Sequence, residues 1–127
     1  MARVLLVDDD VTLRHVMGWA LEDQGFECVH ADNGRIGLEK LCEATVSQDP
    51  FDCIVLDIVM PEVDGWQFLE AVKSNPLWRQ TKVVVLSGLT GSPRDTARAL
   101  AMDCVHFEKR GQFMDLLGQV VERLVTH

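Results

Sequence analysis

Six side chains capable of chemistry lie directly after, or close behind, short apolar segments of this sequence. They are carboxylates, one hydroxyl and one ammonium group: Asp8, Asp9, Asp10, Asp57, Ser87 and Lys109. Clustered carboxylates repel one another and repel phosphate unless a cation lies between them, and such hard oxygen ligands suit Mg²⁺. An ammonium and a hydroxyl can hold phosphoryl oxygens. Brought together by a fold, these residue types predict a site for Mg²⁺ and a phosphoryl group.

The segment after the first apolar run argues against a nucleotide-binding loop. Such loops use glycine or hydroxyl residues so that backbone N–H groups can cradle phosphate. This sequence contains neither GxGxxG nor GxxxxGK[ST] and has three consecutive acids at that position. The acids indicate a cation site.

Two hydrophobic periods alternate along the chain. Short apolar runs predict strands at 4–7, 26–31, 53–56, 82–86 and 104–107. The first, third and fourth runs are nearly continuous in Val, Ile and Leu, which is typical of strands buried on both faces. Helical spacing follows each strand and is clearest in the last helix, at Phe113, Leu116, Leu117, Val120, Val121 and Leu124.

The remaining helices and the turns fit this division. Apolar stripes predict helices around Leu13, Met17, Ala20 and Leu21, around Leu38, Leu41 and Cys42, around Phe68, Leu69 and Val72, and around Ala97, Leu100 and Ala101. Asn33-Gly34 and Asp49-Pro50 mark turns, and Ser92-Pro93 has the pattern of a helix start. Helical crossovers between strands predict a doubly wound parallel α/β sheet in one domain, residues 1–127. Ligands of such sheets bind at the carboxyl ends of the strands, where the six side chains converge.

Length and composition narrow the function. The chain has 127 residues, 47% of them hydrophobic, and a net charge of −8, so we do not expect it to bind nucleic acid or an anionic membrane by itself. No apolar run is long enough to span a bilayer, and the N-terminus does not resemble a signal peptide. The four cysteines lack metal-ligand spacing, so we expect reduced, mostly buried thiols in a cytoplasmic protein.

Taken singly, each candidate has a simpler interpretation. An Asp after a strand is often a helix N-cap, which we expect of Asp10, and a lone Ser87 or Lys109 would be a turn or surface residue. Their joint occurrence at four predicted strand ends favours the functional interpretation.

The chain resembles the receiver domain of bacterial two-component response regulators over about residues 3 to 125. The matching segments are Val7-Asp8-Asp9, Asp57-Ile58-Val59-Met60-Pro61-Glu62-Val63-Asp64-Gly65, Leu86-Ser87-Gly88 and Phe107-Glu108-Lys109. The resemblance implies a flavodoxin-like (βα)5 fold with strand order 2-1-3-4-5. It also implies a phosphorylation-dependent signalling switch, whose partners are a histidine kinase or phosphotransfer protein and a downstream protein or effector domain.

The same resemblance implies roles for individual residues. Asp57 would accept the phosphoryl group, while Asp8, Asp9, Asp57 and the Val59 carbonyl would hold Mg²⁺. Ser87 and Lys109 would contact the phosphoryl group, and Ser87 would report phosphorylation to the surface of the fourth helix, fifth strand and fifth helix. Gly65 and Asp64 would shape the turn into the third helix.

Three features depart from the family pattern. Arg110 follows Lys109 where the family commonly has proline, so we expect no cis peptide there, because a non-proline cis bond costs about 3 kcal/mol. His106 occupies the position of the usual switch aromatic, Tyr or Phe. No effector domain follows, which fits either a single-domain regulator or a receiver excised from a longer protein.

Two alternative functions compete with this reading. Asp8-Asp9-Asp10-Val11-Thr12 fits the DxDxT string of haloacid-dehalogenase-type phosphatases, with Asp8 as nucleophile, but that reading leaves Asp57 and the MPxxDG segment unexplained. A degenerate receiver acting only as a binding module would need a broken site, whereas every site position is filled. We therefore expect a signalling protein that catalyses its own phosphoryl transfer and is not otherwise an enzyme.

Overall fold

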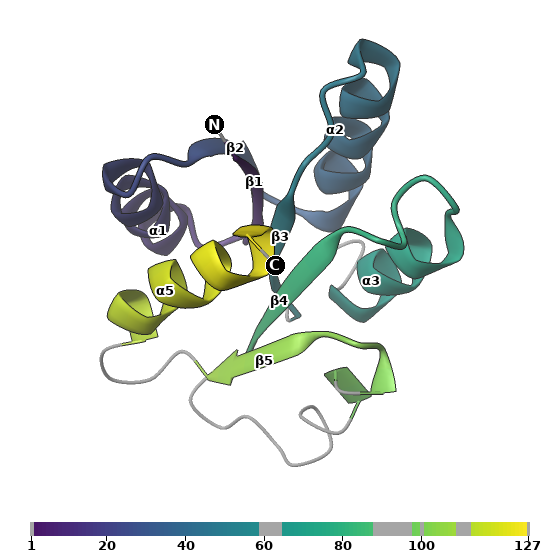
Figure 1. The fold of residues 1–127 in the computed structure, drawn as a ribbon. Coiled ribbons are helices and arrows are strands. Elements are labelled where there is room, and N and C mark those ends of the chain that lie inside the picture. Colours follow the sequence, from purple (N-terminus) through teal and green to yellow (C-terminus); the bar gives the residue numbers. More distant parts are fainter. Residues whose placement is uncertain (1, 59–64, 88–97, 100, 109–112, 127) are drawn as a thin grey trace.

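Five parallel strands form one sheet in the computed structural model, which describes residues 2–58, 65–87, 98–99, 101–108 and 113–126. The strands are β1 (Arg3–Val7), β2 (Glu27–Ala31), β3 (Cys53–Asp57), β4 (Lys82–Ser87) and β5 (Val105–Glu108). Their order across the sheet is β2-β1-β3-β4-β5 (Figure 1). This order confirms the predicted fold. Most of the strand ends differ from the predicted ends, each by one residue.

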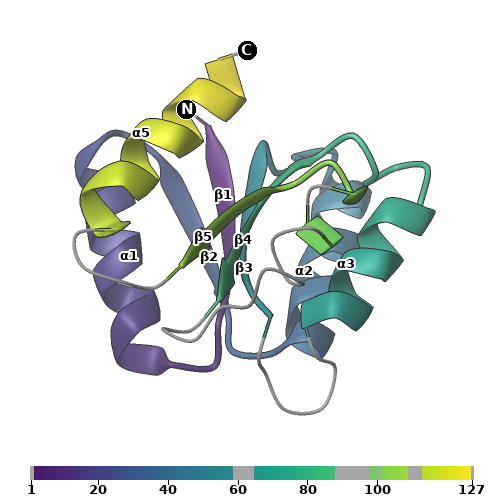
Figure 2. The ribbon, with the colours of Figure 1, turned by 90° about the horizontal axis from the view of Figure 1, so that it is seen from below.

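Helices cover both faces of the sheet. They are α1 (Val11–Asp23), α2 (Gly34–Ser47), α3 (Gly65–Ser74) and α5 (Phe113–Thr126). Figure 2 shows α1 and α5 on one side of the strands and α2 and α3 on the other, as a doubly wound sheet requires. The start predicted for the fourth helix, Ser92-Pro93, lies outside the described residues, and Arg98, Ala99 and Ala101 near its predicted end are helical.

The core consists of two layers because successive strand residues point to opposite faces. Leu5 and Ile54 face the layer under α2 and α3, where Phe68 is fully buried. Leu6 and Val55 face the layer under α1 and α5. Burial on both faces explains why the central strands read as continuous apolar runs.

Strand β2 has a weaker apolar pattern because it lies at the edge of the sheet. Its first residue, Glu27, is exposed, and the next three are only partly buried. Arg3 on β1 ties this edge down, since its guanidinium pairs with Glu27 at 3.0 Å and with Asp49 at 3.4 Å. The predicted start at Phe26 is one residue early, and Phe26 instead packs into the core from the preceding turn.

The prediction of mostly buried thiols holds for only part of the cysteines, all four of which are free. Cys53 and Cys104 are buried and Cys28 is half-buried, but Cys42 is exposed. The core-facing residues of α2 are Gly34, Gly37, Leu41 and Ala44, so Cys42, one position past Leu41, is rotated toward solvent. Burial raises the pKa of Cys53 to about 12 and that of Cys28 to about 11.

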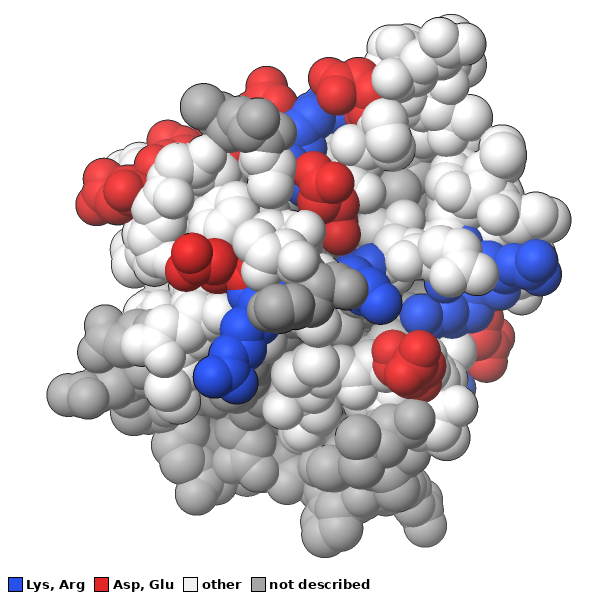
Figure 3. Space-filling model, in the orientation of Figure 1, with Lys and Arg blue, Asp and Glu red and all other residues white. Residues whose placement is uncertain are grey.

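Charged side chains of both signs are interspersed on the face drawn in Figure 3, where Lys and Arg lie among Asp and Glu. No helix in the described part of the chain is long and apolar enough to cross a bilayer.

We predict opposite outcomes for alanine at two helical glycines. A Cβ at Gly37 would lie 2.8 Å from Cε2 of the buried Phe68 ring, so we expect Gly37→Ala to reduce the free energy of unfolding by about 1–3 kcal/mol. The atoms nearest to a Cβ at Gly118 would be those at the end of the flexible Gln24 side chain, which can move aside. Gly118→Ala should therefore be neutral or stabilise by up to about 1 kcal/mol through helix propensity. Urea unfolding measures both, and equal losses would contradict the packing argument.

Candidate functional site

Three carboxylates meet at the carboxyl ends of β1 and β3. These strands pair in parallel with Val7 opposite Leu56, so the residues that follow, Asp8 and Asp57, lie side by side. The carboxylate oxygens of Asp8, Asp9 and Asp57 include one from each residue that lie within 4.8 Å of one another. Asp8 and Asp57 are buried, with 0% and 5% exposure, while Asp9 is exposed. The predicted acidic cluster is thus assembled by the fold.

Backbone hydrogen bonds hold Asp8 at this sheet end. Its amide N donates to the Ala31 carbonyl at 3.1 Å, which extends the β1–β2 ladder. Its carboxylate Oδ1 accepts from the Asp10 amide at 2.9 Å. Asp10 in turn caps α1, because its side chain accepts from the Leu13 amide at 3.0 Å. Asp10 is therefore the helix cap that the sequence predicts, and it is not one of the three grouped carboxylates.

Arg14 lies behind the acidic loop, and no motif of the sequence points to it. Its Nη1 donates to the Asp8 carbonyl at 2.6 Å, and only 7% of the residue is exposed. A signal for its burial exists in the sequence, since Arg14, Met17, Gly18 and Leu21 follow one helical stripe and are all buried. Apolar patterning overlooks a charged residue within such a stripe.

Gly65 sets the approach of α3 to the backbone around Asp57. Its amide donates to the Ile58 carbonyl at 3.1 Å. A Cβ at this position would lie 2.2 Å from Ile58 Cα and 2.6 Å from the Asp57 carbonyl oxygen. Because these neighbours are backbone atoms, only glycine fits here without displacing the end of β3. The structural role predicted for Gly65 follows from this packing, while Asp64 lies outside the described residues.

The other predicted residues are placed only in part. Ser87 ends β4, one residue beyond Leu86, which is the register partner of Asp57. His106 is half-buried on β5 opposite Val85. Val59 and Lys109, with the Lys109–Arg110 bond, lie outside the described residues.

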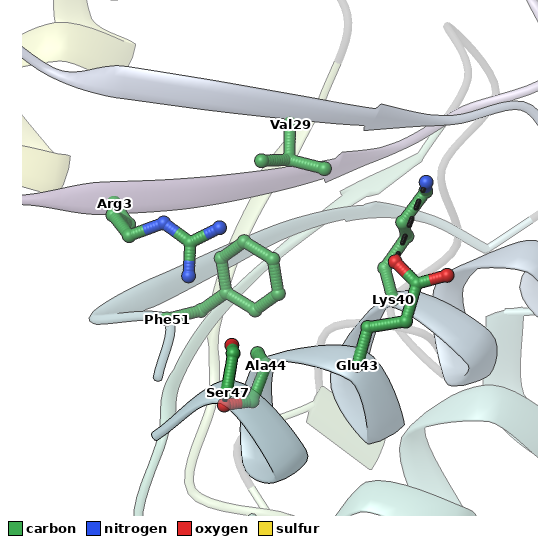
Figure 4. A pocket seen from close by; sticks show the side chains of 7 residues that line it. All are labelled: Arg3, Val29, Lys40, Glu43, Ala44, Ser47 and Phe51. Carbon is green, nitrogen blue, oxygen red and sulfur yellow. Dashed lines mark hydrogen bonds and ion pairs between the residues drawn. The ribbon is translucent and has the colours of Figure 1, made fainter. Parts of the chain in front are cut away.

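A cavity of about 430 Å³ lies away from the acidic cluster, between α2 and the start of β1 (Figure 4). Its charged side chains already have partners. Arg3 pairs with acids and stacks 4.6 Å from the centre of the Phe51 ring, and Lys40 pairs with Glu43 at 3.6 Å. Arg3 links β2 to the segment after α2 through Glu27 and Asp49, so these pairings indicate a structural role.

The acidic cluster has the chemistry of a divalent cation site. Like charges in contact disfavour one another, and burial of two of the three increases that cost. Mg²⁺ binds through one or two carboxylates and retains several waters, which suits a cluster with two buried members and one exposed member. The donor set therefore fits Mg²⁺.

Comparisons with known proteins agree with this geometry. Residues 4–120 match the family model described as the response regulator receiver domain. The response regulator receiver protein CpdR of Brucella abortus is 29% identical over 126 residues, which cover 99% of each chain. The chemotaxis protein CheV1 of Helicobacter pylori is 35% identical over 79% of this chain, which spans only 32% of that protein.

Solved structures give the same result. The chemotaxis protein CheY4 of Vibrio cholerae is similar with a TM-score of 0.80 and 29% identity, over 98% of both chains. The match over nearly the whole chain is to receivers, and nothing in these comparisons supports the phosphatase alternative.

We predict that removing one buried charge stabilises the metal-free protein. Asp57→Asn keeps the shape of the side chain and relieves repulsion with Asp8 and Asp9, so the free energy of unfolding without divalent cations should rise by about 1–3 kcal/mol. Asp23→Asn, at an exposed position on α1, is the control and should change it by less than about 0.5 kcal/mol. Denaturant unfolding in a chelator measures both, and a loss of stability in Asp57→Asn would show that repulsion is not dominant.

Proposed function

This chain belongs to the family of response regulator receiver domains, and we propose that Asp57 is the residue on which it accepts a phosphoryl group. It is a phosphorylation-dependent signalling switch of the two-component type. The observation that carries the assignment of Asp57 is its burial at the end of β3, with a carboxylate oxygen within 4.8 Å of oxygens of Asp8 and Asp9.

The reaction we propose is an in-line transfer from a phosphohistidine. A carboxylate oxygen of Asp57 attacks phosphorus, the P–N bond to the histidine breaks as the P–O bond forms, and the product is an acyl phosphate. The donor is a sensor histidine kinase or a histidine phosphotransfer protein. Beyond this self-directed transfer and its reversal by water, we propose no catalytic activity.

Receiver domains generally bind Mg²⁺ at an acidic pocket, and in this chain we assign its ligands to Asp8, Asp9, Asp57 and the Val59 carbonyl. Bound Mg²⁺ supplies neutralisation of negative charge shared between the carboxylates and the phosphoryl group. Asp8 is held for this role by the hydrogen bonds of its backbone to Ala31 and Arg14, and Asp9 is exposed to solvent.

Ser87 and Lys109 complete the proposed site. The strand ladder brings the end of β4 beside Asp57, so the Ser87 hydroxyl is assigned to the phosphoryl oxygens, with the Lys109 ammonium as their counter-charge. Movement of Ser87 would reach β5, where half-buried His106 takes the place of the family's switch aromatic. The output surface is then the fourth helix, β5 and α5, read by a cytoplasmic protein partner or an effector domain.

The assignment predicts one phosphoryl adduct at one residue. Incubation with Mg²⁺ and acetyl phosphate should add the mass of a single phosphoryl group to the intact protein, and Asp57→Asn should abolish the addition. Asp9→Ala should slow it and should also lose the stabilisation that Mg²⁺ gives the parent, because a ligand stabilises only the form that binds it. Intact-mass spectrometry and thermal unfolding with and without Mg²⁺ supply the readings.

Controls separate the competing functions. Asp10→Ala removes the helix cap without removing a grouped carboxylate, so it should lower stability by about 1 kcal/mol but retain the adduct. An adduct that persists in Asp57→Asn, or steady hydrolysis of a phosphomonoester that requires Asp8, would refute the assignment. No adduct in the parent would support the inert binding module.

We further predict that the acyl phosphate is long-lived. Val59 and Leu89, two positions after Asp57 and Ser87, are apolar, and both lie outside the described residues. Apolar side chains cannot orient a water for attack on phosphorus. Val59→Asn combined with Leu89→Glu should accelerate dephosphorylation about tenfold, or about 1.4 kcal/mol of barrier. Decay of the adduct mass after donor removal measures the rate, and unchanged decay would exclude control by these positions.

A further inference from the structure

A buried contact chain connects the acidic loop to the edge of the sheet through Arg14. On one side, Arg14 Nη1 donates to the Asp8 carbonyl at 2.6 Å. On the other side, Arg14 Nε donates to Nδ1 of His30 on β2 at 3.3 Å. The guanidinium therefore has a hydrogen-bond partner on each side. One partner is the backbone carbonyl of Asp8 in the acidic cluster, and the other is the titratable imidazole of His30.

Several features hold the His30 imidazole in this place. The His15 ring stacks on it with centroids 5.1 Å apart and an interplanar angle of 25°. Gly18 leaves room for it on α1, since a Cβ there would lie 2.9 Å from His30 Cε1. His30 belongs to the edge strand and is only partly buried, so its ring can exchange protons with solvent.

The contact requires a neutral imidazole. Arginine has only donors and keeps its proton, so His30 Nδ1 can accept from Arg14 only while that nitrogen carries no hydrogen. Burial lowers the pKa of His30 below its ordinary value of 6.5, and electrostatic interactions with Arg14 and His15 lower it further, against an opposing effect of Glu22. These three groups lie on α1, while β1 presents Leu6 as the register partner of His30. On β2 itself, Cys28 lies two residues before His30, with a thiol pKa raised to about 11.

We propose that Arg14 is a positioning residue for the acidic site, and that the neutral imidazole of His30 holds Arg14 against the Asp8 carbonyl. The inference rests on the proposed role of Asp8 and Asp9 as Mg²⁺ ligands. It adds a residue pair outside the ligand set that sets how well the loop is organised for the cation. Protonation of His30 converts the Nδ1 acceptor into a donor that faces the Arg14 cation. Arg14 is then released, and the acidic loop that carries Asp8 and Asp9 is held less firmly.

A pair of substitutions separates positioning from charge. His30→Leu removes the acceptor and leaves net charge unchanged at neutral pH, whereas His30→Asn offers an amide oxygen near the position of Nδ1 and does not titrate. At about pH 7.5, calorimetry should show Mg²⁺ bound about two- to tenfold more weakly by His30→Leu than by the parent, the equivalent of one hydrogen bond. His30→Asn should match the parent. Parent-like affinity in His30→Leu would overturn the proposal.

The pH profile adds a second measurement. Between about pH 7.5 and about pH 5.5, the parent should lose Mg²⁺ affinity toward the level of His30→Leu, while His30→Asn should lose less. His15→Asn changes the neighbouring histidine but keeps the imidazole that accepts from Arg14. It should therefore still lose Mg²⁺ affinity on acidification, with the loss displaced to higher pH, because His15 contributes to lowering the pKa of His30. Identical profiles in the parent and His30→Asn would also overturn the proposal.

Measurements on the metal-free protein test the role of Arg14 and His30 independently of Mg²⁺ binding. The amide resonances of Asp9 and Asp10 should shift with pH in the parent, following titration of His30, and should not do so in His30→Asn. Because the pKa of His30 is lowered by folding, its contribution to stability is complete above pH 6.5 and is lost as the pH falls below it. In urea unfolding, His30→Asn should therefore lose less of its free energy of unfolding at acid pH than the parent loses. Unmoved amides in the parent would refute the positioning, whereas moving amides without Mg²⁺ binding at any pH would instead refute the proposed metal site.

Discussion

The pairing of β1 with β3 is the constraint on which the rest of the site depends. With Val7 opposite Leu56, the next residue of each strand is an aspartate, and the sheet holds two buried carboxylates together that would otherwise separate. The hydrophobic layers on both faces supply the stabilisation that offsets this repulsion. A site with this built-in conflict favours whatever brings positive charge to it, which makes the end of the sheet responsive to its ligands.

The surrounding structure limits how this conflict can relax. Gly65 brings α3 against the backbone at Asp57, and the Asp10 cap fixes the start of α1 beside Asp8. Arg14, on α1, donates a hydrogen bond to the Asp8 carbonyl. Backbone around both buried carboxylates is therefore held by specific contacts, and exposed Asp9 is the member of the cluster with the most freedom to adjust.

Much of this structure can be predicted from the sequence because its strongest signals are physical ones. Continuous Val, Ile and Leu runs identify β1, β3 and β4, and the acids at the ends of the β1 and β3 runs locate the site at the carboxyl ends. The hydrophobic pattern fails where the burial of a residue depends on its contacts with a neighbouring element of the fold. Arg14 is charged yet buried, because it has His30 and the Asp8 carbonyl to bind. Cys42 is apolar in type yet exposed, because the core-facing stripe of α2 passes through Leu41 and Ala44.

The unequal burial of the four cysteines has a practical consequence for chemical labelling. Alkylating reagents attack thiolates, so the raised pKa values of Cys53 and Cys28 keep both thiols in the unreactive form. Burial of Cys53 and partial burial of Cys28 limit access of the reagent as well. Cys104 is buried as well, and Cys42 lies exposed on α2. A maleimide dye should therefore attach selectively at Cys42 in the folded protein without any cysteine being replaced. The unchanged sequence thus offers a single attachment point for fluorescence on the helix layer opposite α1 and α5.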